Sequence, residues 1–377
     1  MKLVVFGLAV SSSWGNGHAT LWRGLCRALA ARGHLVVFFE RDVPYYAEHR
    51  DLWTLPHGRL HLYPSWDDVR ETAARELADA DAGMVTSFCP DALEAEALLL
   101  DSPAERRVFY DLDTPVTLDA LARGDGVAYV GPHGLADYDL VLSYTGGNSL
   151  AQLRDRLGAR LAVPLYGSVD PAVHQPVDPE SSDRADLSYL GTYAADRQDG
   201  VEKLFLEPAR RRPSRRFVLG GSMYPYDFPW MSNIYYRRHV SPDQHPAFYC
   251  SSRLTLNVTR RAMAETGYCP SGRLFEAAAC GVPILSDWWE GLDAFFTPGR
   301  EILVASTTDE AIASLERSDD ELCDIARRAR ERTLVEHTAA RRALELEQAL
   351  QGTRSNRRVG HHSGSRSGHA DSTAGVL

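Results

Sequence analysis

Short apolar runs and amphipathic segments alternate along the first half of the chain. Residues 2–10 (KLVVFGLAV) and 35–40 (LVVFFE) are apolar and contain β-branched residues, as buried strands do. Between them, residues 19–34 have apolar side chains at helical spacing, and Gly33 ends the predicted helix. A strand, a glycine-rich turn, a helix and a second strand in this order predict a βαβ unit, and therefore a parallel sheet.

The pattern continues through four further apolar runs, at residues 82–88, 106–115, 138–145 and 160–171. These runs do not alternate between apolar and polar side chains, which predicts strands buried on both faces. We therefore predict a first Rossmann-like domain over residues 1–170.

A change in composition separates this series from a second one. Residues 169–186 are rich in Pro, Asp and Ser and predict a linker, which we place at 171–186. The second series has apolar runs at residues 187–193, 215–225, 253–258, 281–287 and 301–306. It predicts a second Rossmann-like domain over residues 187–330. The predicted fold class is thus α/β, with two tandem doubly wound domains.

The end of the chain has two different compositions. Residues 319–350 have an amphipathic pattern that predicts one or two helices closing the chain, and we place a C-terminal helix at residues 331–351. Residues 352–377 are almost free of large apolar side chains, so they cannot bury enough surface to offset the entropy of ordering. We predict a disordered tail there.

Composition and charge narrow the classes of partner and compartment. The chain has 377 residues and a net charge of −10, which argues against a nucleic-acid partner, because phosphate contacts need clustered Lys and Arg. Its six cysteines form no C-x-x-C motif, which predicts a cytoplasmic protein without a zinc ribbon. No stretch approaches the roughly 20 apolar residues of a spanning helix, so any membrane role is expected to be peripheral.

The loops at the carboxyl ends of the predicted strands are the expected place for chemistry, because doubly wound sheets bind ligands there. If the two domains face each other, both crevices open into one interdomain cleft. The loop after the first strand contains Gly15, Asn16, Gly17 and His18. Its glycines let the backbone approach a ligand, and the following helix offers free N–H groups. His18 is either a catalytic or sugar-hydroxyl contact or an ordinary residue at the start of the helix.

The same loop matches a dinucleotide fingerprint only in part, since Thr20 stands where the third glycine is expected. Glu40, at the end of the second predicted strand, keeps a dinucleotide site open as an alternative.

Residues 110–115 (YDLDTP) contain Asp111 and Asp113. Carboxylates two residues apart on a strand point the same way, so this pair predicts a polar site that faces the cleft, without a metal. In the alternative, one aspartate caps the next helix and the other belongs to the turn before Thr-Pro.

In the second series, the apolar run at residues 215–225 contains a glycine turn that includes Gly221 and Ser222. A Gly-Gly-Ser turn suits phosphate, which its backbone N–H groups and hydroxyl can bind. The alternative is a tight turn that needs a positive φ angle.

Residues 271–276 (SGRLFE) open a predicted helix with polar side chains. Ser271 is a good N-cap, and Gly272 leaves the first turn bare. Arg273 lies at the positive end of the helix dipole, where a cation is unfavourable unless an anion is bound. These features predict a pyrophosphate site. Glu276 is too far along for a capping box and is placed to accept hydrogen bonds from a ribose diol.

The strand after this helix ends in a polar loop. We expect it to bring Asp287, Trp288 and Glu290 to the cleft.

Residues 271–305 resemble the donor-binding core of a glycosyltransferase with the two-domain GT-B fold. The stretch SGRLFEAAACGVPILSD is similar to the E-A-x-A-x-G-x-P-V signature of the large family-4-like group. With residues 245–260 and 163–171, the chain looks most like the CgeB-like (spore maturation) subfamily. The resemblance covers about residues 1–350 and is strongest over 215–305.

This resemblance implies a sugar donor activated by a nucleoside diphosphate and an acceptor that is a glycan, a lipid-linked molecule or a small molecule. It also implies a reaction that needs no metal or cofactor, and an enzyme of the cytoplasm or the membrane periphery. By resemblance, Glu276 holds the donor ribose, while Arg273 and Ser271 lie on the diphosphate side. The remaining matched positions are the glycine loop at Gly221 and Ser222, the nucleobase segment at His239 and Val240, and the N-terminal loop from Gly15 to His18.

One position departs from the family pattern. The wider group has a second glutamate eight residues before the first, where this chain has Tyr268; Glu265 lies three residues earlier. The departure bears on sugar choice and catalysis rather than on nucleotide binding.

Cleavage of a sugar–pyrophosphate bond builds negative charge on the leaving group, which Arg273 and a helix N-terminus can stabilise without a divalent ion. The resemblance implies retention of the anomeric configuration, in which the leaving phosphate takes the acceptor proton. If the reaction inverts, Asp113 or His18 is the candidate base. The alternatives are a nucleotide-sugar epimerase of the same architecture, a non-catalytic nucleotide-sugar-binding relative and, more distantly, a nicotinamide-dependent dehydrogenase.

Overall fold

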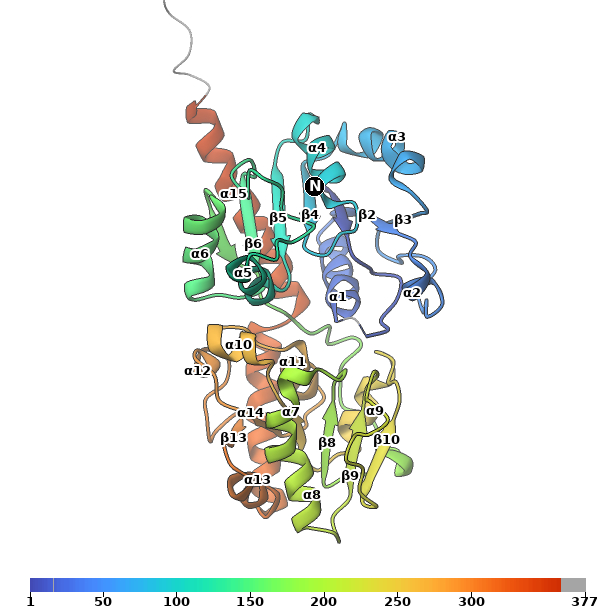
Figure 1. Cartoon of the computed structure of the whole chain (residues 1–377), viewed down its shortest axis with the longest axis vertical. Helices are drawn as coiled ribbons and strands as arrows, with labels where there is room; N and C mark the ends of the chain where they lie inside the picture. Colours follow the sequence, from blue (N-terminus) through green and yellow to red (C-terminus); the bar gives the residue numbers. More distant parts are fainter. Residues whose placement is uncertain (16, 361–377) are drawn as a thin grey trace, which may run out of the picture.

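The computed structural model describes residues 1–15 and 17–360 and shows two α/β domains, one above the other (Figure 1). The first sheet has seven strands in the order β3-β2-β1-β4-β5-β6-β7, and the second has six in the order β10-β9-β8-β11-β12-β13. All pairs are parallel. Each sheet therefore has the 3-2-1-4-5-6 order of doubly wound nucleotide-binding domains. The predicted fold class is confirmed.

The strands of the two sheets fall in separate parts of the chain. Those of the first sheet are β1 (Lys2–Gly7), β2 (Leu35–Arg41), β3 (Arg59–Tyr63), β4 (Ala82–Thr86), β5 (Arg107–Asp111), β6 (Leu140–Ser143) and β7 (Ala162–Pro164). Those of the second are β8 (Leu187–Leu190), β9 (Phe217–Gly220), β10 (Ile234–Arg237), β11 (Thr255–Asn257), β12 (Ile284–Ser286) and β13 (Leu303–Val304). Every apolar run that the sequence indicated contains a strand.

Two strands were not predicted, β3 and β10, and they are equivalent. Each is the third strand of its domain and forms the edge of its sheet next to the second strand. An edge strand is less buried than a central one, so its sequence carries a weaker apolar signal. In β10 two of the four residues, Tyr235 and Tyr236, are exposed.

Helices connect the strands and cover both faces of each sheet. In the N-terminal part they are α1 (His18–Ala31), α2 (Pro44–Ala47), α3 (Trp66–Leu77), α4 (Ala92–Asp101), α5 (Thr114–Arg123) and α6 (Asn148–Leu157). The second domain has α7 (Gln198–Val201), α8 (Glu207–Arg211), α9 (His245–Cys250), α10 (Arg261–Thr266), α11 (Gly272–Ala279), α12 (Leu292–Phe295) and α13 (Thr308–Leu315), and the chain ends with α14 (Asp319–Glu336) and α15 (Ala339–Gly360). A π-helical turn over Glu202–Leu206 joins α7 to α8.

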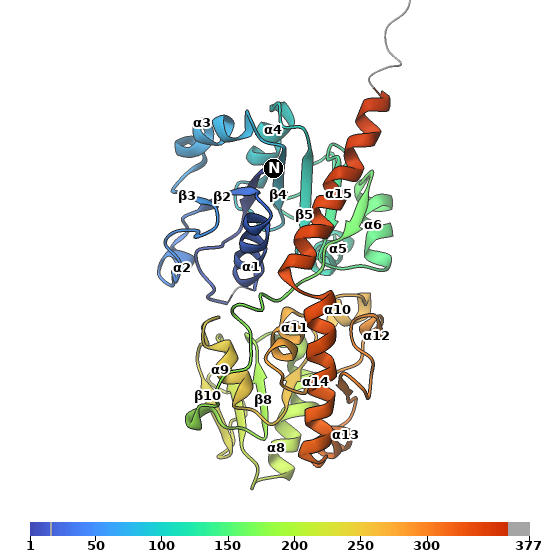
Figure 2. The same ribbon diagram turned by 180° about the vertical axis from the view of Figure 1, so that it is seen from behind.

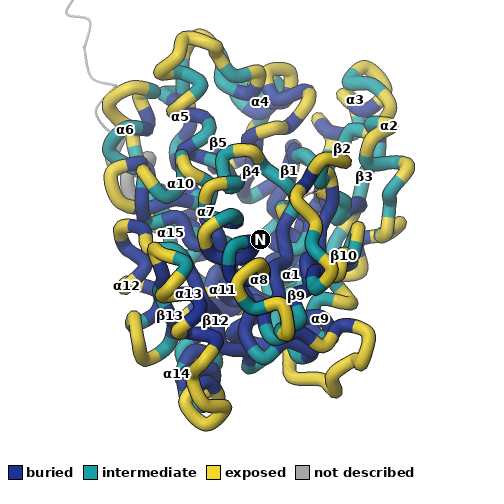
Figure 3. The backbone as a smooth tube through the Cα atoms, turned by 60° about the horizontal axis from the view of Figure 1, so that its bottom comes forward, coloured by how far each residue is buried: buried dark blue, intermediate teal, exposed yellow. Residues whose placement is uncertain are grey.

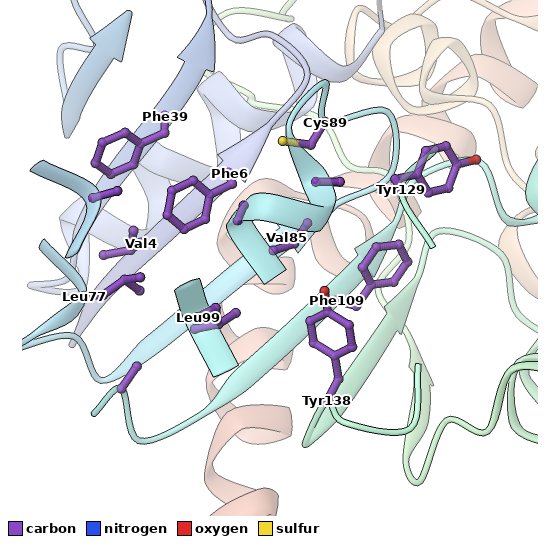
Figure 4. Packing of buried hydrophobic residues seen from close by; sticks show 14 of the residues in the cluster. Val4, Phe6, Phe39, Leu77, Val85, Cys89, Leu99, Phe109, Tyr129 and Tyr138 are labelled. Atoms are coloured by element: carbon purple, nitrogen blue, oxygen red, sulfur yellow. The ribbon is translucent and has the colours of Figure 1, made fainter. Parts of the chain in front are cut away.

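The core of the first domain lies on both faces of its sheet. On one face, Phe6, Val85 and Phe109 from central strands pack against Leu77 and Leu99 from helices α3 and α4 (Figure 4). The central strands are buried and the outer loops exposed in both domains (Figure 3). This burial on two faces explains why the central strands are continuous apolar runs.

The last two helices link the domains. Helix α14 packs on the second domain through Ile325 and Ala329, and α15 crosses back to pack Leu346 and Leu350 beside α1 of the first domain (Figure 2). The break between them falls at Thr338, whose hydroxyl accepts a hydrogen bond from the N–H of Arg341 at 3.2 Å.

Of the one or two helices expected over residues 319–350, the structure has two, and the last begins at Ala339 rather than at residue 331. The backbone just before the linker pairs with the chain at the break, since the N–H of Val169 donates to the carbonyl of His337 and the N–H of Ala339 to the carbonyl of Val169. A local sequence pattern cannot reveal these hydrogen bonds, because they join residues that are distant in the chain. Helix α15 also continues through residues 352–360 of the predicted disordered tail, and residues 361–377 of that tail lie outside the described residues.

Among the helices of the described chain, none is both long enough and apolar enough to cross a membrane.

Candidate functional site

A cavity of about 510 Å³ lies between the two domains and is lined by both. Its lining comes from segments that follow β1, β2, β4, β5, β6 and β7 in the first domain and β8, β9, β10 and β11 in the second. These are the carboxyl ends of the strands, including both points where the strand order reverses. The predicted interdomain cleft is therefore present, and its volume is typical of a small-molecule site.

Most of the predicted site residues line this cavity. They are Gly15, Gly17, His18, Asp113, Gly221, Ser222, His239, Val240, Ser271, Gly272, Arg273 and Glu276. Asn16, which was predicted with them, lies outside the described residues. Asp287, Trp288 and Glu290 are described and are not part of the lining.

His18 and Asp113 face each other in the cavity, although 95 residues separate them in the chain. The Nε2 atom of His18 lies 3.1 Å from Oδ2 of Asp113, and both side chains are only partly exposed. His18 is the first residue of α1 and Asp113 precedes the first residue of α5, so the ends of β1 and β5 bring them together. An imidazole that is hydrogen-bonded to a carboxylate is the usual arrangement of a general base and the group that orients it.

The two aspartates of YDLDTP have separate roles. Asp113 lines the cavity, whereas Asp111 is fully buried behind it and accepts hydrogen bonds from the N–H of Asp113 and the hydroxyl of Thr117, each at 3.1 Å. Burial raises the pKa of the Asp111 carboxyl from 3.8 to about 6. The prediction of a paired, cleft-facing site thus holds for one carboxylate only, because the strand ends at Asp111 and the chain turns before Asp113.

Helix α11 points its N-terminus at the cavity, as the sequence indicated. Ser271 occupies the N-cap position, but its side chain makes no capping hydrogen bond, so the hydroxyl is not used within the helix. Gly272 follows, and Nη1 of Arg273 donates to Oδ1 of Asn257 at 2.8 Å. The Nε of Arg273 is buried without a hydrogen-bond partner among the described residues. An anion at this helix end would satisfy the free donors.

Two further arginines line the same side of the cavity and were not predicted. Arg197 and Arg260 follow β8 and β11, next to Arg273. Burial and the like charges of Arg273 and Arg260 lower the pKa of Arg197. Arg260 is paired with Asp196, its Nε 3.0 Å from Oδ2. A concentration of positive charge of this kind is relieved by an anion such as a diphosphate.

Glu276 is buried one helical turn beyond Arg273, with one edge on the cavity. Its Oε2 lies 3.3 Å from Nδ1 of His245 and accepts from the hydroxyl of Tyr249 at 3.4 Å. Burial by itself raises the pKa of this carboxyl, but His174, His245 and Arg273 outweigh it and hold the pKa at about 2. Burial lowers the pKa of His174, so we ascribe the effect on Glu276 chiefly to His245 and Arg273. Glu276 is thus an ionised acceptor for hydroxyl groups.

His174, His245 and Glu276 form a cluster that the sequence did not reveal. Their ligand atoms all lie within 4.8 Å of one another, which is compatible with a metal ion in this part of the described chain. In the structure Nε2 of His174 approaches Nδ1 of His245 at 3.5 Å, and Nε2 of His245 faces the carbonyl of Val240 at 3.3 Å. The ring of His245 is therefore held by hydrogen-bond partners on both nitrogens, and it connects the linker, which carries His174, to Glu276.

At the Gly221–Ser222 turn, the fold itself requires a glycine at position 221. Gly221 has φ +143°, and a Cβ atom there would lie 2.0 Å from the carbonyl oxygen of Gly191. Its N–H donates to the carbonyl of Arg237 at 2.9 Å, so it is not free for a phosphate. Ser222 still lines the cavity and faces the N-terminal loop, since a Cβ atom at Gly15 would lie 3.9 Å from its hydroxyl.

His239 forms a contact between the domains. Its ring lies 4.7 Å from the ring of Trp14 in the first domain, and Trp14 stacks on His49 at 4.1 Å. Val240 lines the cavity next to it. The predicted nucleobase segment is therefore at one end of the cavity, beside a stack of aromatic rings.

The three predicted residues outside the lining lie behind it or on the surface. Asp287 accepts hydrogen bonds from the N–H and the hydroxyl of Thr259, and Thr259 itself lines the cavity. Trp288 is half exposed, and Glu290 is exposed. The loop after β11 lies between β12 and the cavity, so the end of β12 supports the site rather than forming its wall.

Tyr268 stands where the family pattern has a glutamate, and its ring is not in the cavity lining. It has φ +47°, and its ring fills the space between Gly147 of the first domain and Gly291 of the second. A Cβ atom at either glycine would lie within 2.6 Å of the ring. The carbonyl of Tyr268 also accepts from the N–H of Gly146 at 3.0 Å. Tyr268 therefore joins the domains.

Glu40, on which the dinucleotide alternative depends, is occupied within the fold. It is fully buried and accepts hydrogen bonds from the N–H groups of Val10 and Ser11 and from the hydroxyl of Ser11. It is not part of the cavity lining.

Comparisons with known proteins agree with this geometry. A family model described as "Glycosyl transferase-like" matches residues 197–348. None of the curated proteins that were compared matches the chain in sequence.

Solved structures are similar over nearly the whole chain. Sucrose-phosphate synthase from Thermosynechococcus elongatus has a TM-score of 0.68 and 15% identity over 94% of this chain and 100% of that one. HepE from Anabaena, in complex with UDP and glucose, has a TM-score of 0.61 and 12% identity over 93% and 99%. An alpha-glucosyltransferase in complex with UDP-glucose and DNA has a TM-score of 0.68 and 12% identity over 93% and 99%. The chain therefore has the two-domain GT-B fold of these proteins, and its residues 197–348 are similar to the glycosyl transferase-like family.

Proposed function

We propose that the protein is a glycosyltransferase that moves a sugar from a nucleoside-diphosphate donor to a hydroxyl acceptor. The proposal depends on one observation: the two domains contribute different functional groups to the same cavity. The second domain contributes three arginines and an ionised glutamate, and the first contributes a histidine–aspartate pair. The match to the glycosyl transferase-like family over residues 197–348 supports the same function.

The second domain is the donor side in this proposal. Arg197, Arg273 and the N-terminus of α11 bind the diphosphate, and Glu276 accepts hydrogen bonds from the ribose diol. The arginines supply the positive charge that a divalent ion supplies elsewhere, so we propose a reaction that does not depend on a metal. The UDP and UDP-glucose complexes of the similar structures support a nucleotide ligand of this kind.

The first domain is the acceptor side. When the bond between the anomeric carbon and the diphosphate breaks, its electron pair leaves with the diphosphate, and Arg197 and Arg273 stabilise the new charge. The acceptor oxygen forms the new bond to the anomeric carbon and loses its proton. We assign His18 to take that proton, with Asp113 holding the ring and stabilising its charged form.

Two stereochemical courses use these residues differently. Retention, which the resemblance to the family-4-like group implies, lets the leaving phosphate take the proton and needs no base. Inversion by direct displacement needs a base opposite the leaving group. The contact between His18 and Asp113 favours inversion. The coupling constant of the anomeric proton in the product, measured by NMR with an α-linked donor, decides between them.

The proposal extends to subfamily and compartment. We propose membership of the CgeB-like group and a cytoplasmic location. All six cysteines are free in the structure, which supports the location, because disulfides are rare in the cytoplasm.

Calorimetric titration of the full chain with UDP, GDP, dTDP and ADP tests the proposed function. We expect one of these nucleotides to bind and Arg273→Gln to weaken that binding. Product analysis with and without acceptor then separates transfer from epimerisation, because an epimerase releases free nucleotide and sugar without an acceptor. A folded protein that binds none of the four nucleotides would overturn the proposal.

A further inference from the structure

The two sides of the cavity differ in charge as well as in catalytic groups. Arg197, Arg260 and Arg273 all belong to the second domain. Among the described residues of the first domain that line the cavity there is no lysine or arginine, and Asp113 is the one carboxylate. A phosphorylated or carboxylated acceptor would therefore find no fixed cation on this side and would meet Asp113.

Apolar and aromatic side chains form much of the cavity wall in the first domain. They are Leu8, Leu21, Tyr46, Phe88, Leu112 and Tyr144, and Ser13, Thr20 and Ser168 add hydroxyl groups beside them. Of the polar residues on this side, Ser13 is occupied, because its hydroxyl donates to Asp51 at 2.6 Å. A glycan acceptor needs a high density of hydrogen-bonding side chains, whereas an apolar body gains from burial against such a wall.

Phe88 is the most distinctive part of this wall. It follows β4 at the point where the strand order reverses, and it has φ +62°, a conformation that costs energy for a bulky residue. Its ring lies 6.2 Å from the ring of His18 and remains 36% exposed. Behind it, the ring of Tyr129 lies at 5.0 Å and is fixed by a hydrogen bond with Thr117.

Strained residues of this kind persist where the surrounding structure holds them, often at binding sites. Here the strained residue carries an aromatic ring that lies near the proposed base and is not buried in the core. An aromatic ring of the acceptor could pack against Phe88 with its hydroxyl directed to His18.

We propose that the acceptor is a small, uncharged molecule with a flat apolar body and a phenolic hydroxyl, and that Phe88 is the platform that binds its body. This inference rests on the proposed function and narrows its acceptor to one class. The hydroxyl proton passes to His18 and then to solvent, the acceptor oxygen bonds to the anomeric carbon, and the nucleoside diphosphate leaves with the electron pair of the broken bond.

A matched set of acceptors tests the inference on the full chain. With the sugar donor of the nucleotide that binds in the titration above, 7-hydroxy-4-methylcoumarin is compared with 7-hydroxycoumarin-3-carboxylic acid and with maltose. We expect kcat/KM for the neutral coumarin to exceed that for the acid and for maltose by tenfold or more. Equal or better transfer to the acid or to maltose would overturn the inference.

A binding experiment separates this inference from the proposed function. Binding of the neutral coumarin to the complex with nucleoside diphosphate is followed by its fluorescence. If no nucleotide binds, the proposed function fails. If the nucleotide binds but the coumarin neither binds nor is glycosylated, the acceptor inference fails alone.

Variants then assign the platform. Phe88→Ala is expected to raise KM for the coumarin tenfold or more, and Phe88→Leu, which keeps an apolar side chain, to raise it less. Tyr226→Ala is the control, because Tyr226 is a fully exposed aromatic residue outside the cavity lining. An unchanged KM in Phe88→Ala, or an equal rise in Tyr226→Ala, would show that Phe88 is not the platform.

Discussion

The two domains have the same strand order and opposite chemistry at their facing ends. In each, the loops after the first and fourth strands help to line the cavity, β1 and β4 in one domain and β8 and β11 in the other. The first domain places a histidine–aspartate pair in an apolar wall, whereas the second places arginines and a glutamate beside a helix N-terminus. The shared topology thus fixes where ligands bind, and the loop residues decide which chemical groups are bound there.

The comparison also explains how a sugar transfer could be divided between domains. The charged donor needs cations, and the arginines that line the cavity all belong to the domain opposite the proposed base. A base next to several arginines would hold its proton poorly, since like charges disfavour the protonated form. Separation across the cleft lets each side keep its own electrostatics.

The largest expected effect comes from breaking the base of the first domain. His18→Ala and Asp113→Asn should lower the rate of sugar transfer by about 10²- to 10⁴-fold, because general base catalysis is lost or the ring is no longer oriented. The nucleotide dissociation constant, measured by calorimetry, should change little, since the arginines are untouched. Transfer at an undiminished rate in both variants would show that the reaction needs no base and would favour the retaining course.

The converse change removes charge from the second domain. Arg197→Gln and Arg273→Gln should each weaken nucleotide binding by about 1.5–3 kcal/mol, the cost of a lost hydrogen bond to a charged group. Arg210→Gln is the matched control, because Arg210 lies in the same domain with its guanidinium exposed and away from the cavity. Equal losses in all three variants would mean that the effect is general electrostatics and not a diphosphate site.

A third change tests the burial of the Asp111 carboxyl in the first domain. The pKa of Asp111 is raised from 3.8 to about 6 by burial, so folding disfavours its ionised form. An acid with a raised pKa costs stability as pH rises through the interval between the unfolded and folded values, here from about 4 to about 6. Asp111→Asn should therefore gain stability relative to the wild type above pH 6 and lose that advantage below pH 4.

The size of this effect is at most about 3 kcal/mol, from two pKa units at roughly 1.4 kcal/mol each. Urea unfolding of both proteins at pH 4 and at pH 8 measures it. A stability difference that does not vary with pH would show that Asp111 is not buried in an unfavourable ionised form.

The smallest expected effect concerns the contact that holds the domains together. Gly147→Ala places a Cβ atom 2.6 Å from the ring of Tyr268 at a φ of +57°, and it should destabilise the protein by at least about 1 kcal/mol more than a control. Gly124→Ala is that control, because Gly124 also has a positive φ and has nothing within 4 Å of the added atom. Equal midpoints of thermal unfolding in the two variants would show that the Tyr268 ring moves aside without a loss of stability.

Central strands and the donor helix could be predicted because their signals are local. A strand buried on both faces is apolar throughout. The start of helix α11 could be predicted because serine is a preferred residue at the N-cap position, which Ser271 occupies. The edge strands β3 and β10 were missed, because one-sided pairing leaves their sequences short and partly polar. Two helices at the end of the chain were among the expectations, but the position of the break between α14 and α15 was not predicted, because backbone hydrogen bonds with Val169 define it.

Within the site, residues close in sequence to a glycine turn or a helix start were the ones predicted. Arg197 was missed, since it ends a short 3-10 helix after β8, in a segment without a recognisable motif. The loop after β12 was expected in the cleft, but Thr259 from the neighbouring strand end occupies that place. Neither outcome can be read from spacing, because both depend on which strand ends lie side by side.

The sequence by itself determined the α/β class, the two parallel-sheet domains and the residue types available at each strand end. These follow from hydrophobic patterning and turn chemistry, which act over a few residues. Only the tertiary structure brought His18 within 3.1 Å of Asp113, gathered the arginines on one side and placed Tyr268 between two glycines. Those contacts join residues that are distant in the chain, and the packing of the two sheets against their helices, together with the α15 crossover, decides which of them meet.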